Sequence, residues 1–344
     1  MPAYLKSLAT AVPPHVLKTT DVIAEATAIF NGRHQDFERL MPVFANTGIE
    51  TRYSVRPYAW FRQDQGWPER MEAYLDGATA LFREAASQAL ETANLSAGDI
   101  DAIITISSTG ITTPSIEARM LDDMGFRQDV RRSPVFGLGC AGGVSGLSLA
   151  AALAREQTVL LVVIELCTLA FRPDEMTKSN IVATALFGDG AAACVLSPDS
   201  SGAIGEIEFT GEHTWPGTLD VMGWRIDPQG FGAIFSRSIP DFAAHNIRPA
   251  ADRFLSRKGL AIGDLGQFVF HPGGAKVITA LEAAFELEVG LLRNERTVLA
   301  GFGNMSAPTV FFVLAEALKS PFSGRRFLSA LGPGFTASFL TMLC

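Results

Sequence analysis

The sequence predicts an α/β fold in which a largely parallel sheet is covered by helices on both faces. Short apolar runs typical of buried strands alternate with segments whose apolar residues recur at helical spacing. The run Thr158–Ile164 is continuously apolar after its first residue and rich in β-branched side chains, which is typical of a strand covered on both faces. The alternation begins again near residue 201, so we expect two similar α/β halves, residues 1–200 and 201–344.

The composition supports a large folded core and excludes several classes of partner. The chain has 344 residues, 48% of them apolar, and a formal net charge of -8, which argues against binding to nucleic acid or an anionic membrane. Four cysteines without a close pairing motif, and a first segment interrupted by Lys6 and Pro13-Pro14, indicate a cytoplasmic protein. The longest apolar run, Val159–Phe171, contains Glu165 and is too short to span a bilayer.

In the first half, residues that typically end a strand or cap a helix accompany the predicted elements. Tyr4–Val12 is predicted as a strand closed by Pro13-Pro14, and Thr20 or Asp21 caps the helix that follows. Asp76–Ala93 has apolar residues at helical spacing and is predicted as a long amphipathic helix. The remaining elements are a buried strand over Ile100–Ser107, a helix opened by Thr112–Ser115, the strand Thr158–Ile164 and a strand over Ala191–Leu196.

The second half repeats the pattern and ends in a hairpin. Gly332-Pro333-Gly334 separates two apolar runs, Phe327–Leu331 and Phe335–Leu340, which predicts two paired strands. The other predicted strands are Ile204–Glu208, Gln267–Phe270 and Val298–Gly301, and the predicted helices are Phe242–Leu255, Lys276–Phe285 and Ser306–Leu318.

Cys140 is the first candidate for chemistry. It follows Gly137 and Gly139 at the end of a short apolar run and precedes an Ala/Leu/Gly segment with helical spacing. The positive end of a helix favours a thiolate, and the glycines leave space for a substrate to approach. A buried, inert cysteine is the competing interpretation of the same residue.

His271 and Asn304 are the second and third candidates. His271 follows a strand and precedes Pro272-Gly273-Gly274, and Asn304 lies in a glycine turn before a helix. Alone, each has an ordinary interpretation: a hydrogen-bonded core histidine and a turn or helix-cap residue. Together with Cys140 they supply a nucleophile, a base and an amide donor for an oxyanion, because each is expected where a strand gives way to a helix. The other four histidines lack metal-ligand spacing, so we expect no metal site.

At these residues the sequence resembles the type III polyketide synthases, the chalcone and stilbene synthase group of the thiolase fold. Five motifs in the family's order carry the resemblance across nearly the whole chain: Gly139-Cys140-Ala141-Gly142, Phe187-Gly188-Asp189-Gly190-Ala191-Ala192, His271-Pro272-Gly273-Gly274, Gly303-Asn304-Met305-Ser306 and Gly332-Pro333-Gly334. The resemblance implies a thiolase-like αβαβα sandwich of two similar halves and a homodimer. It also implies that Cys140 carries the acyl group while His271 and Asn304 act on the extender.

The resemblance also implies a set of cavity residues. Phe187 matches one of two phenylalanines that gate the cavity in plant members, and Ala233 falls at the second gate position. Small Ala170 and Ala233 favour room for a long or bulky chain, such as that of an alkylpyrone or alkylresorcinol, whereas Trp224 removes room elsewhere. The implied cavity positions are Ser108, Thr113, Cys167, Ala170, Phe187, Trp224, Ala233, Gly332, Pro333 and Gly334.

Coenzyme A recognition is the least developed part of the resemblance. Arg39, with Arg52 nearby, matches the basic cluster that holds coenzyme A phosphates in plant members, while the aligned positions around Pro42 and Asn46 are uncharged. An acyl carrier protein is therefore an alternative donor of the starter. We expect no cofactor beyond the coenzyme A thioesters that serve as substrates.

The function predicted first is an iterative type III polyketide synthase. It transfers an acyl group from a starter acyl-CoA to Cys140, extends it by decarboxylative condensation with malonyl-CoA, and cyclises the product to a pyrone or resorcinol. The alternative is a single-step β-ketoacyl carrier-protein synthase III-like enzyme, which shares Cys, His and Asn on the same fold. A thiolase-fold protein that binds acyl groups or a partner without turnover is a third interpretation. A cysteine hydrolase fits the residue types but not the ordered motifs.

Overall fold

The structure is a computed structural model that describes residues 1–30, 37–63, 65–236 and 238–344. Nine strands form one sheet in the order β11-β12-β13-β8-β1-β7-β6-β4-β5, and the antiparallel pair β1–β8 joins its two parts. The first part contains β1 (Ala3–Ala11), β4 (Ala102–Ile106), β5 (Arg131–Val135), β6 (Val159–Leu166) and β7 (Asp189–Ser197). The second part contains β8 (Gly205–Thr214), β11 (Gln267–Phe270), β12 (Arg325–Gly332) and β13 (Thr336–Leu343).

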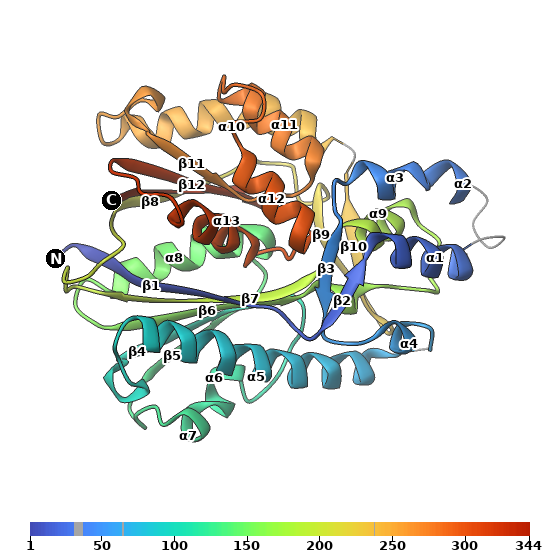
Figure 1. Cartoon of the computed structure of the whole chain (residues 1–344), viewed down its shortest axis with the longest axis horizontal. Coiled ribbons are helices and arrows are strands. Elements are labelled where there is room, and N and C mark those ends of the chain that lie inside the picture. Colours follow the sequence, from blue (N-terminus) through green and yellow to red (C-terminus); the bar gives the residue numbers. More distant parts are fainter. Residues whose placement is uncertain (31–36, 64, 237) are drawn as a thin grey trace.

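Helices cover each part of the sheet on both faces, so the molecule has five layers in the order αβαβα (Figure 1). Helix α5 (Trp67–Thr92) packs on the outer face of the first part, and α10 (Ile239–Ser256) and α11 (Ala275–Ala284) cover the second. Helices α8 (Gly142–Leu153) and α13 (Thr309–Leu318) lie between the two parts. The thiolase-like sandwich expected from the sequence is confirmed.

Strand β6 shows why its sequence is apolar at every position. Leu161 and Val163 pack into the central core beneath α8, whereas Leu160 and Val162 pack on the outer face against α5. All eight residues of β6 are buried, because each of its two faces is covered by a helix layer.

The glycines of α8 allow the central layer to close. A Cβ atom at Gly143 would lie 2.4 Å from the carbonyl oxygen of Ala307, and one at Gly146 would lie 2.8 Å from Ile106. Only glycine leaves space for this helix between the two parts of the sheet. The small residues that follow Cys140 therefore position the helix on which the cysteine stands.

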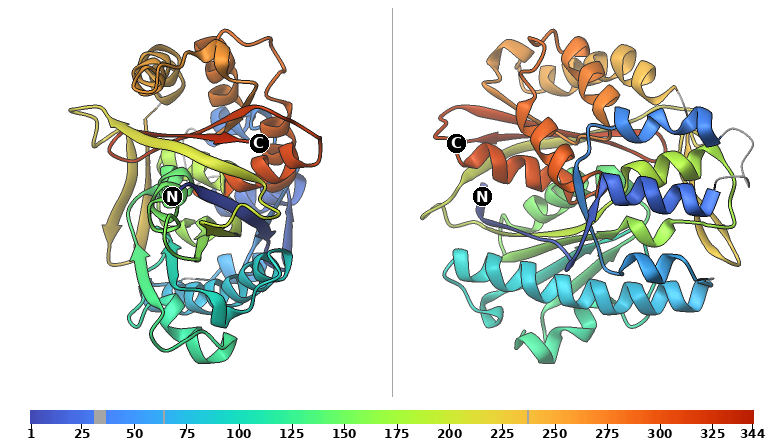
Figure 2. Two further views of the ribbon diagram at one scale, coloured as in Figure 1. Left: turned by 90° about the vertical axis from the view of Figure 1, so that its left-hand side faces the viewer. Right: turned by 45° about the vertical axis from the view of Figure 1, so that its right-hand side comes forward.

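The remaining elements gather mainly at one end of the sandwich, away from the two chain termini (Figures 1 and 2). They include two antiparallel ribbons, β2 (His15–Lys18) with β3 (Thr51–Ser54), and β9 (Met222–Asp227) with β10 (Gly230–Phe235). The helices here are α1 (Thr19–Phe30), α2 (Phe37–Leu40), α3 (Pro42–Asn46), α4 (Tyr58–Phe61) and α9 (Lys178–Leu186). The short helices α6 (Ile116–Arg119) and α7 (Leu121–Met124) lie elsewhere.

The structure corrects one predicted element near the site. Residues 298–301, predicted as a strand, belong to helix α12 (Arg293–Phe302). Glu295, Val298 and Leu299 are buried, whereas Arg293 and Thr297 are exposed, and this three- to four-residue spacing is a helical pattern. Asn304 therefore lies between two helices and not after a strand. The β9–β10 ribbon and α9 were not predicted.

Candidate active site

Cys140, His271 and Asn304 line one cavity of about 390 Å³. Cys140 stands at the start of α8, His271 directly after β11, and Asn304 in the turn before α13. The three residues come from both halves of the chain, and their exposed fractions are 7%, 5% and 3%. The structure therefore brings together the three groups that the sequence indicated, at the bottom of a cavity.

The turn that carries Cys140 is held by tight packing. Residues Gly139–Ala141 form a single 3₁₀ turn, and Gly139 has a φ of 49°, in the left-handed region that glycine adopts without strain. A Cβ atom at Gly139 would lie 2.6 Å from Pro333 Cδ. The Ser108 hydroxyl accepts hydrogen bonds from the N–H groups of Gly137 (3.2 Å) and Gly139 (3.1 Å). Ser108 thus fixes the loop that presents the thiol.

Burial determines the resting protonation state of Cys140. Burial raises the pKa of its thiol to about 12, and the nearby Glu165 carboxyl acts in the same direction. A hydrogen bond from the Ser306 side chain favours the thiolate but does not offset the burial. Burial therefore opposes the thiolate that the helix start is expected to favour, and the thiol has to lose its proton to react.

His271 is available as the acceptor of that proton. Its backbone N–H donates to the carbonyl of Ser329 (2.9 Å), which continues the β11–β12 register and fixes the position of the ring. Both ring nitrogens are buried without a hydrogen-bond partner in the described part of the chain. Burial lowers the pKa of His271 to about 4, which favours a neutral imidazole with one acceptor nitrogen.

Asn304 is oriented by its neighbours. Its side-chain oxygen accepts the N–H of Ser306 (2.8 Å), and its Nδ2 donates one hydrogen to the carbonyl of Gly273 (3.1 Å). Its backbone N–H donates to the carbonyl of Leu186 (2.8 Å). The amide orientation is therefore fixed, and one of the two hydrogens on Nδ2 has no acceptor among the described residues. That hydrogen is available to an oxyanion.

Comparison with known proteins agrees with this arrangement in both halves. The family models for chalcone and stilbene synthases match residues 2–200 with the N-terminal domain and residues 206–340 with the C-terminal domain. The chain belongs to the chalcone and stilbene synthase family. The predicted type III polyketide synthase is confirmed, and the single-step carrier-protein synthase is not supported.

Relatives of the family resemble this chain over most of its length. It is 36% identical to a 1,3,6,8-tetrahydroxynaphthalene synthase of Streptomyces peucetius, covering 97% of this chain and 91% of that protein. It is 27% identical to a phloroglucinol synthase of Pseudomonas fluorescens, with 96% and 97% covered. The crystal structure of the Streptomyces coelicolor tetrahydroxynaphthalene synthase, described as a bacterial type III polyketide synthase, superposes with a TM-score of 0.94, at 27% identity and 99% coverage of both chains.

Several residues expected on the cavity wall form a compact apolar cluster beside it. Cys167, Phe187 and Ala233 pack together with Trp224, and the Phe187 ring lies 5.9 Å from the Trp224 ring. Ala233 is paired with Trp224 across the β9–β10 ribbon. The side chains of this cluster therefore occupy the space beside Ala233. The room for a long acyl chain that a small residue at position 233 suggested is not present there.

A second, smaller cavity of about 70 Å³ also borders this cluster. Cys167 and Phe187 line it, together with Arg52 and apolar residues of α1. Arg52 is only 3% exposed, and its Nε and Nη1 atoms have no hydrogen-bond partner in the described residues. The assignment of Arg52 to coenzyme A phosphates is therefore corrected, because its guanidinium is buried away from the catalytic cavity. Arg39 lies on α2 and is exposed.

The other expected wall residues have different positions. Thr113 is exposed on the surface, and Ala170 is buried at the end of a 3₁₀ turn that follows β6. Gly334 lies beside Thr336 and Thr214, whereas Gly332 and Pro333 pack against the Cys140 turn: a Cβ atom at Gly332 would lie 2.6 Å from Ala141 Cβ. Their role in this structure is to let β12 approach the nucleophile.

Sequence analysis missed three polar residues of the cavity region. Ser306 donates to Cys140 and stands two residues after Asn304 in the same motif, so the motif itself was a signal. Lys178 and Lys276 line the cavity at the starts of α9 and α11. The sequence feature that could have identified them is a cation in the first turn of a helix, where acidic residues are favoured.

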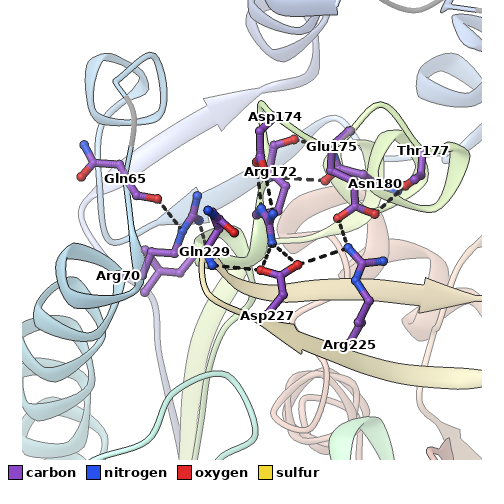
Figure 3. A network of polar contacts seen from close by, with 11 residues as sticks. Gln65, Arg70, Arg172, Asp174, Glu175, Thr177, Asn180, Arg225, Asp227 and Gln229 are labelled. Carbon is purple, nitrogen blue, oxygen red and sulfur yellow. Dashed lines mark hydrogen bonds and ion pairs between the residues drawn. The ribbon is translucent and has the colours of Figure 1, made fainter.

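A network of ion pairs anchors the β9–β10 ribbon to the loop before α9 (Figure 3). Arg172 donates to Asp174 (2.6 Å) and to Asp227 (2.9 Å), and Arg225 donates to Glu175 (2.8 Å). The Asp174 carboxylate raises the pKa of Arg172, which keeps the guanidinium charged. Trp224 precedes Arg225 on the same strand, so this network positions the apolar cluster.

Within the described ranges, no helix is both long and apolar enough to cross a membrane. The same residues contain no group of three or more His, Cys, Asp or Glu side chains arranged to hold a metal ion.

Proposed function

We propose that Cys140, His271 and Asn304 carry out iterative decarboxylative condensation of malonyl-CoA onto an acyl group bound to Cys140. The observation that supports this assignment most strongly is the shared cavity with two unpartnered nitrogens on a buried histidine. A buried polar atom without a partner is costly and marks a place where a ligand completes the bonding.

Acyl transfer begins with the neutral thiol. The proton of Cys140 passes to the free nitrogen of His271, and the thiolate attacks the carbonyl carbon of an acyl-CoA. The thioester bond to coenzyme A breaks, and its sulfur leaves with the proton from His271. Ser306, which donates to the sulfur, stabilises the transient thiolate.

Condensation uses the same groups on a second thioester. The thioester oxygen of malonyl-CoA accepts hydrogen bonds from Asn304 Nδ2 and from the His271 ring, and loss of carbon dioxide leaves an enolate on that oxygen. The enolate carbon attacks the acyl-Cys140 carbonyl, and the cysteine sulfur leaves. Each cycle adds two carbons, and the extended chain cyclises to a pyrone or resorcinol.

The test is product analysis of the purified protein. We would incubate it with malonyl-CoA and a panel of short, aromatic and long-chain acyl-CoA starters, and identify products by mass spectrometry beside Cys140→Ala. Products with two or more malonyl-derived units, absent from the variant, are expected. A single-extension β-ketoacyl product, or no acylation of Cys140 by any donor, would contradict the proposal.

We also propose that the enzyme is a cytoplasmic homodimer that needs no cofactor beyond its thioester substrates. Ile111 (50% exposed) and Phe136 (48% exposed) are large apolar side chains that follow the neighbouring strands β4 and β5, and a second copy would cover them. All four cysteines are unpaired, which fits a reducing compartment. Sedimentation should give twice the mass of the chain, and activity should survive dialysis against a chelator.

A further inference from the structure

Arg52 is a charged side chain that is buried without a partner. It lies on β3, is 3% exposed, and its Nε and Nη1 atoms form no hydrogen bond with any described residue. Burial lowers its pKa to about 10, which still leaves the guanidinium charged at neutral pH. A buried cation that lacks hydrogen bonds is unfavourable, so its presence indicates a ligand that the described chain does not itself supply.

The carboxylates near Arg52 are already bound by other groups. The charge of Asp189 favours the charged form of Arg52, but both of its oxygens accept hydrogen bonds from Thr168, one from the N–H (2.7 Å) and one from the hydroxyl (2.6 Å). Glu25 is bound by Nε (2.8 Å) and Nη2 of Arg62, which lowers the pKa of Glu25. The charges of Glu25 and Arg62 cancel, and that of Arg52 is left over.

The cavity of about 70 Å³ beside Arg52 combines this cation with an apolar wall. Val22 and Ala26 of α1 line it together with Phe61 and Phe171, whose ring centroids lie 6.0 Å apart. An inorganic phosphate would place several of its oxygens against hydrocarbon. A carboxylate can instead accept N–H groups of one guanidinium at one end and present an apolar body to the wall at the other. The cavity therefore fits a small carboxylic acid with a short apolar chain.

Helix α9 separates this cavity from the catalytic one. Val182 and Leu186 lie four residues apart on one face of α9 and line the catalytic cavity, whereas Ala183 and Thr184 line the small cavity. Within the described ranges the two cavities share no lining residue, and none of the three catalytic residues lines the small one. An acid bound beside Arg52 would thus lie outside the space that a thioester at the catalytic residues occupies.

The outer rim of the small cavity is formed by α1 and α4, which lie at the same end of the molecule as α9 (Figure 1). Its lining residues Glu25, Ile29, Tyr58 and Phe61 are half-buried, whereas Arg52 is buried. An acid that enters between these helices would place its carboxylate at the inner wall and its chain against the rim.

We propose that the cavity beside Arg52 binds a small carboxylic acid with a short apolar chain, at a site separate from that of the thioester substrates. The N–H groups of the Arg52 guanidinium bind the carboxylate, and the chain packs against α1, Phe61 and Phe171. The inference goes beyond the proposed function and does not depend on it, because no catalytic residue takes part.

The test is calorimetric titration of the purified protein with sodium hexanoate. Hexanoate should bind with one molecule per chain. Hexanamide, which has the same chain without the charge, should bind about tenfold more weakly or less, and sodium phosphate should not displace hexanoate. No binding of hexanoate, equal binding of hexanamide, or displacement by phosphate would each overturn the inference.

Two variants locate the bound acid without any assay of turnover. Arg52→Met removes the charge and keeps an apolar side chain of similar length, and Ala26→Leu fills the cavity from α1 while leaving Arg52 in place. Each should raise the Kd for hexanoate about tenfold or more. The variants change different walls of the cavity, so either one decides the question if the other does not fold.

Arg56→Met is the matched control, because it makes the same change of charge four residues further along the chain. Arg56 is paired with Asp76 (2.8 Å) and does not line the cavity, so the Kd for hexanoate should stay within about twofold of the wild-type value. An unchanged Kd in Arg52→Met or Ala26→Leu, or an equal rise in Arg56→Met, would show that the acid does not bind beside Arg52.

Discussion

The ion-pair network around Arg172 and the catalytic cluster around His271 both contain buried polar side chains, but they are completed differently. The Arg172 side chain is 4% exposed, and its guanidinium is bound by Asp174 and Asp227. His271 is 5% exposed, and neither ring nitrogen has a partner in the described residues. Both clusters adjoin the apolar cluster formed by Cys167, Phe187, Ala233 and Trp224: Trp224 precedes Arg225 on β9, and Phe187 forms a backbone bridge with Asn304.

The difference separates groups that hold the fold from groups that receive a substrate. A buried charge with its partners in place restricts the elements that carry it, here the β9–β10 ribbon and the loop before α9. A buried ring without partners contributes no bond to the fold and leaves its nitrogens free for a proton or an oxyanion. The comparison predicts that changes in the first cluster alter stability and changes in the second alter catalysis.

The largest expected effect is on catalysis, from His271→Gln. The glutamine amide can donate a hydrogen bond but cannot take the Cys140 proton, so acylation of the cysteine should slow by about 10³-fold. The rate is measured as burst-phase labelling of Cys140 by a starter acyl-CoA, followed by mass spectrometry of the intact protein.

The same variant tests whether His271 contributes to the fold. Its free energy of unfolding at pH 7.5 should stay within about 1 kcal/mol of the wild-type value, because no hydrogen bond of the ring is lost. A loss of several kcal/mol would show that the histidine is structural and would remove the contrast with Arg172.

The next effect is the pH dependence of stability. Burial lowers the pKa of His271 from 6.5 to about 4, so between these values the unfolded chain binds a proton that the folded protein does not. Above pH 6.5 the ring is neutral in both states and its ionisation does not affect stability, whereas protonation of the unfolded chain destabilises the fold by about 3 kcal/mol as the pH falls to about 4. In urea titrations, the free energy of unfolding of His271→Gln should rise by about this much relative to that of the wild type as the pH is lowered from 7.5 to 4. Taking the difference at each pH cancels groups with opposite dependence, such as Glu165, whose pKa burial raises to about 8. A constant difference would contradict a neutral, buried imidazole.

A smaller loss of stability is expected from Arg172→Met. The change leaves Asp174 without its cation and leaves Asp227, only 23% exposed, with the longer contact to Arg225 (3.5 Å) alone. Because Asp174 is half-exposed and can be hydrated, we expect a loss of about 2 kcal/mol, less than for a fully buried pair. Chemical denaturation measures it.

Arg83→Met is the matched control for this prediction. The Arg83–Asp123 pair is exposed on both sides, at 53% and 48%, so its removal should cost less than about 0.5 kcal/mol. Equal losses for the two variants would show that burial of the Arg172 network contributes nothing to stability.

Much of the fold near the site followed from periodicity and end signals in the sequence. The strand Gln267–Phe270 has the predicted bounds, and the closing hairpin around Gly332-Pro333-Gly334 is present. Turn residues at the end of each strand determine these two features locally. The helix around Leu299 was missed, since a short apolar run does not distinguish a strand from the buried face of a helix. The motifs indicated the three catalytic residues, but spacing alone could not show that they share a cavity.

The residues that sequence reasoning misplaced depend on contacts between distant segments. The position of Arg52 in the sequence suggested phosphate binding. Its side chain instead enters the interior, where Gly188 and Gly303 leave space for it. Ala233 suggested an open volume, but the ribbon pairs it with Trp224. Burial, which raises the pKa of Cys140 against the effect expected from the helix start, also cannot be read from one motif.

The smallest effect tests whether the two clusters communicate through Trp224. Its indole N–H donates to the carbonyl of Ser108 (2.8 Å), and the Ser108 hydroxyl in turn holds the Cys140 turn. Trp224→Phe removes this bond but keeps an aromatic ring, so we expect a loss of about 1 kcal/mol in stability. Trp215→Phe is the control, because in the described chain its indole nitrogen has no hydrogen-bond partner. If Trp224→Phe also slows acylation of Cys140 several-fold while Trp215→Phe does not, the ribbon positions the nucleophile through Ser108. Equal acylation rates in the two variants would show that the Arg172 network affects stability alone.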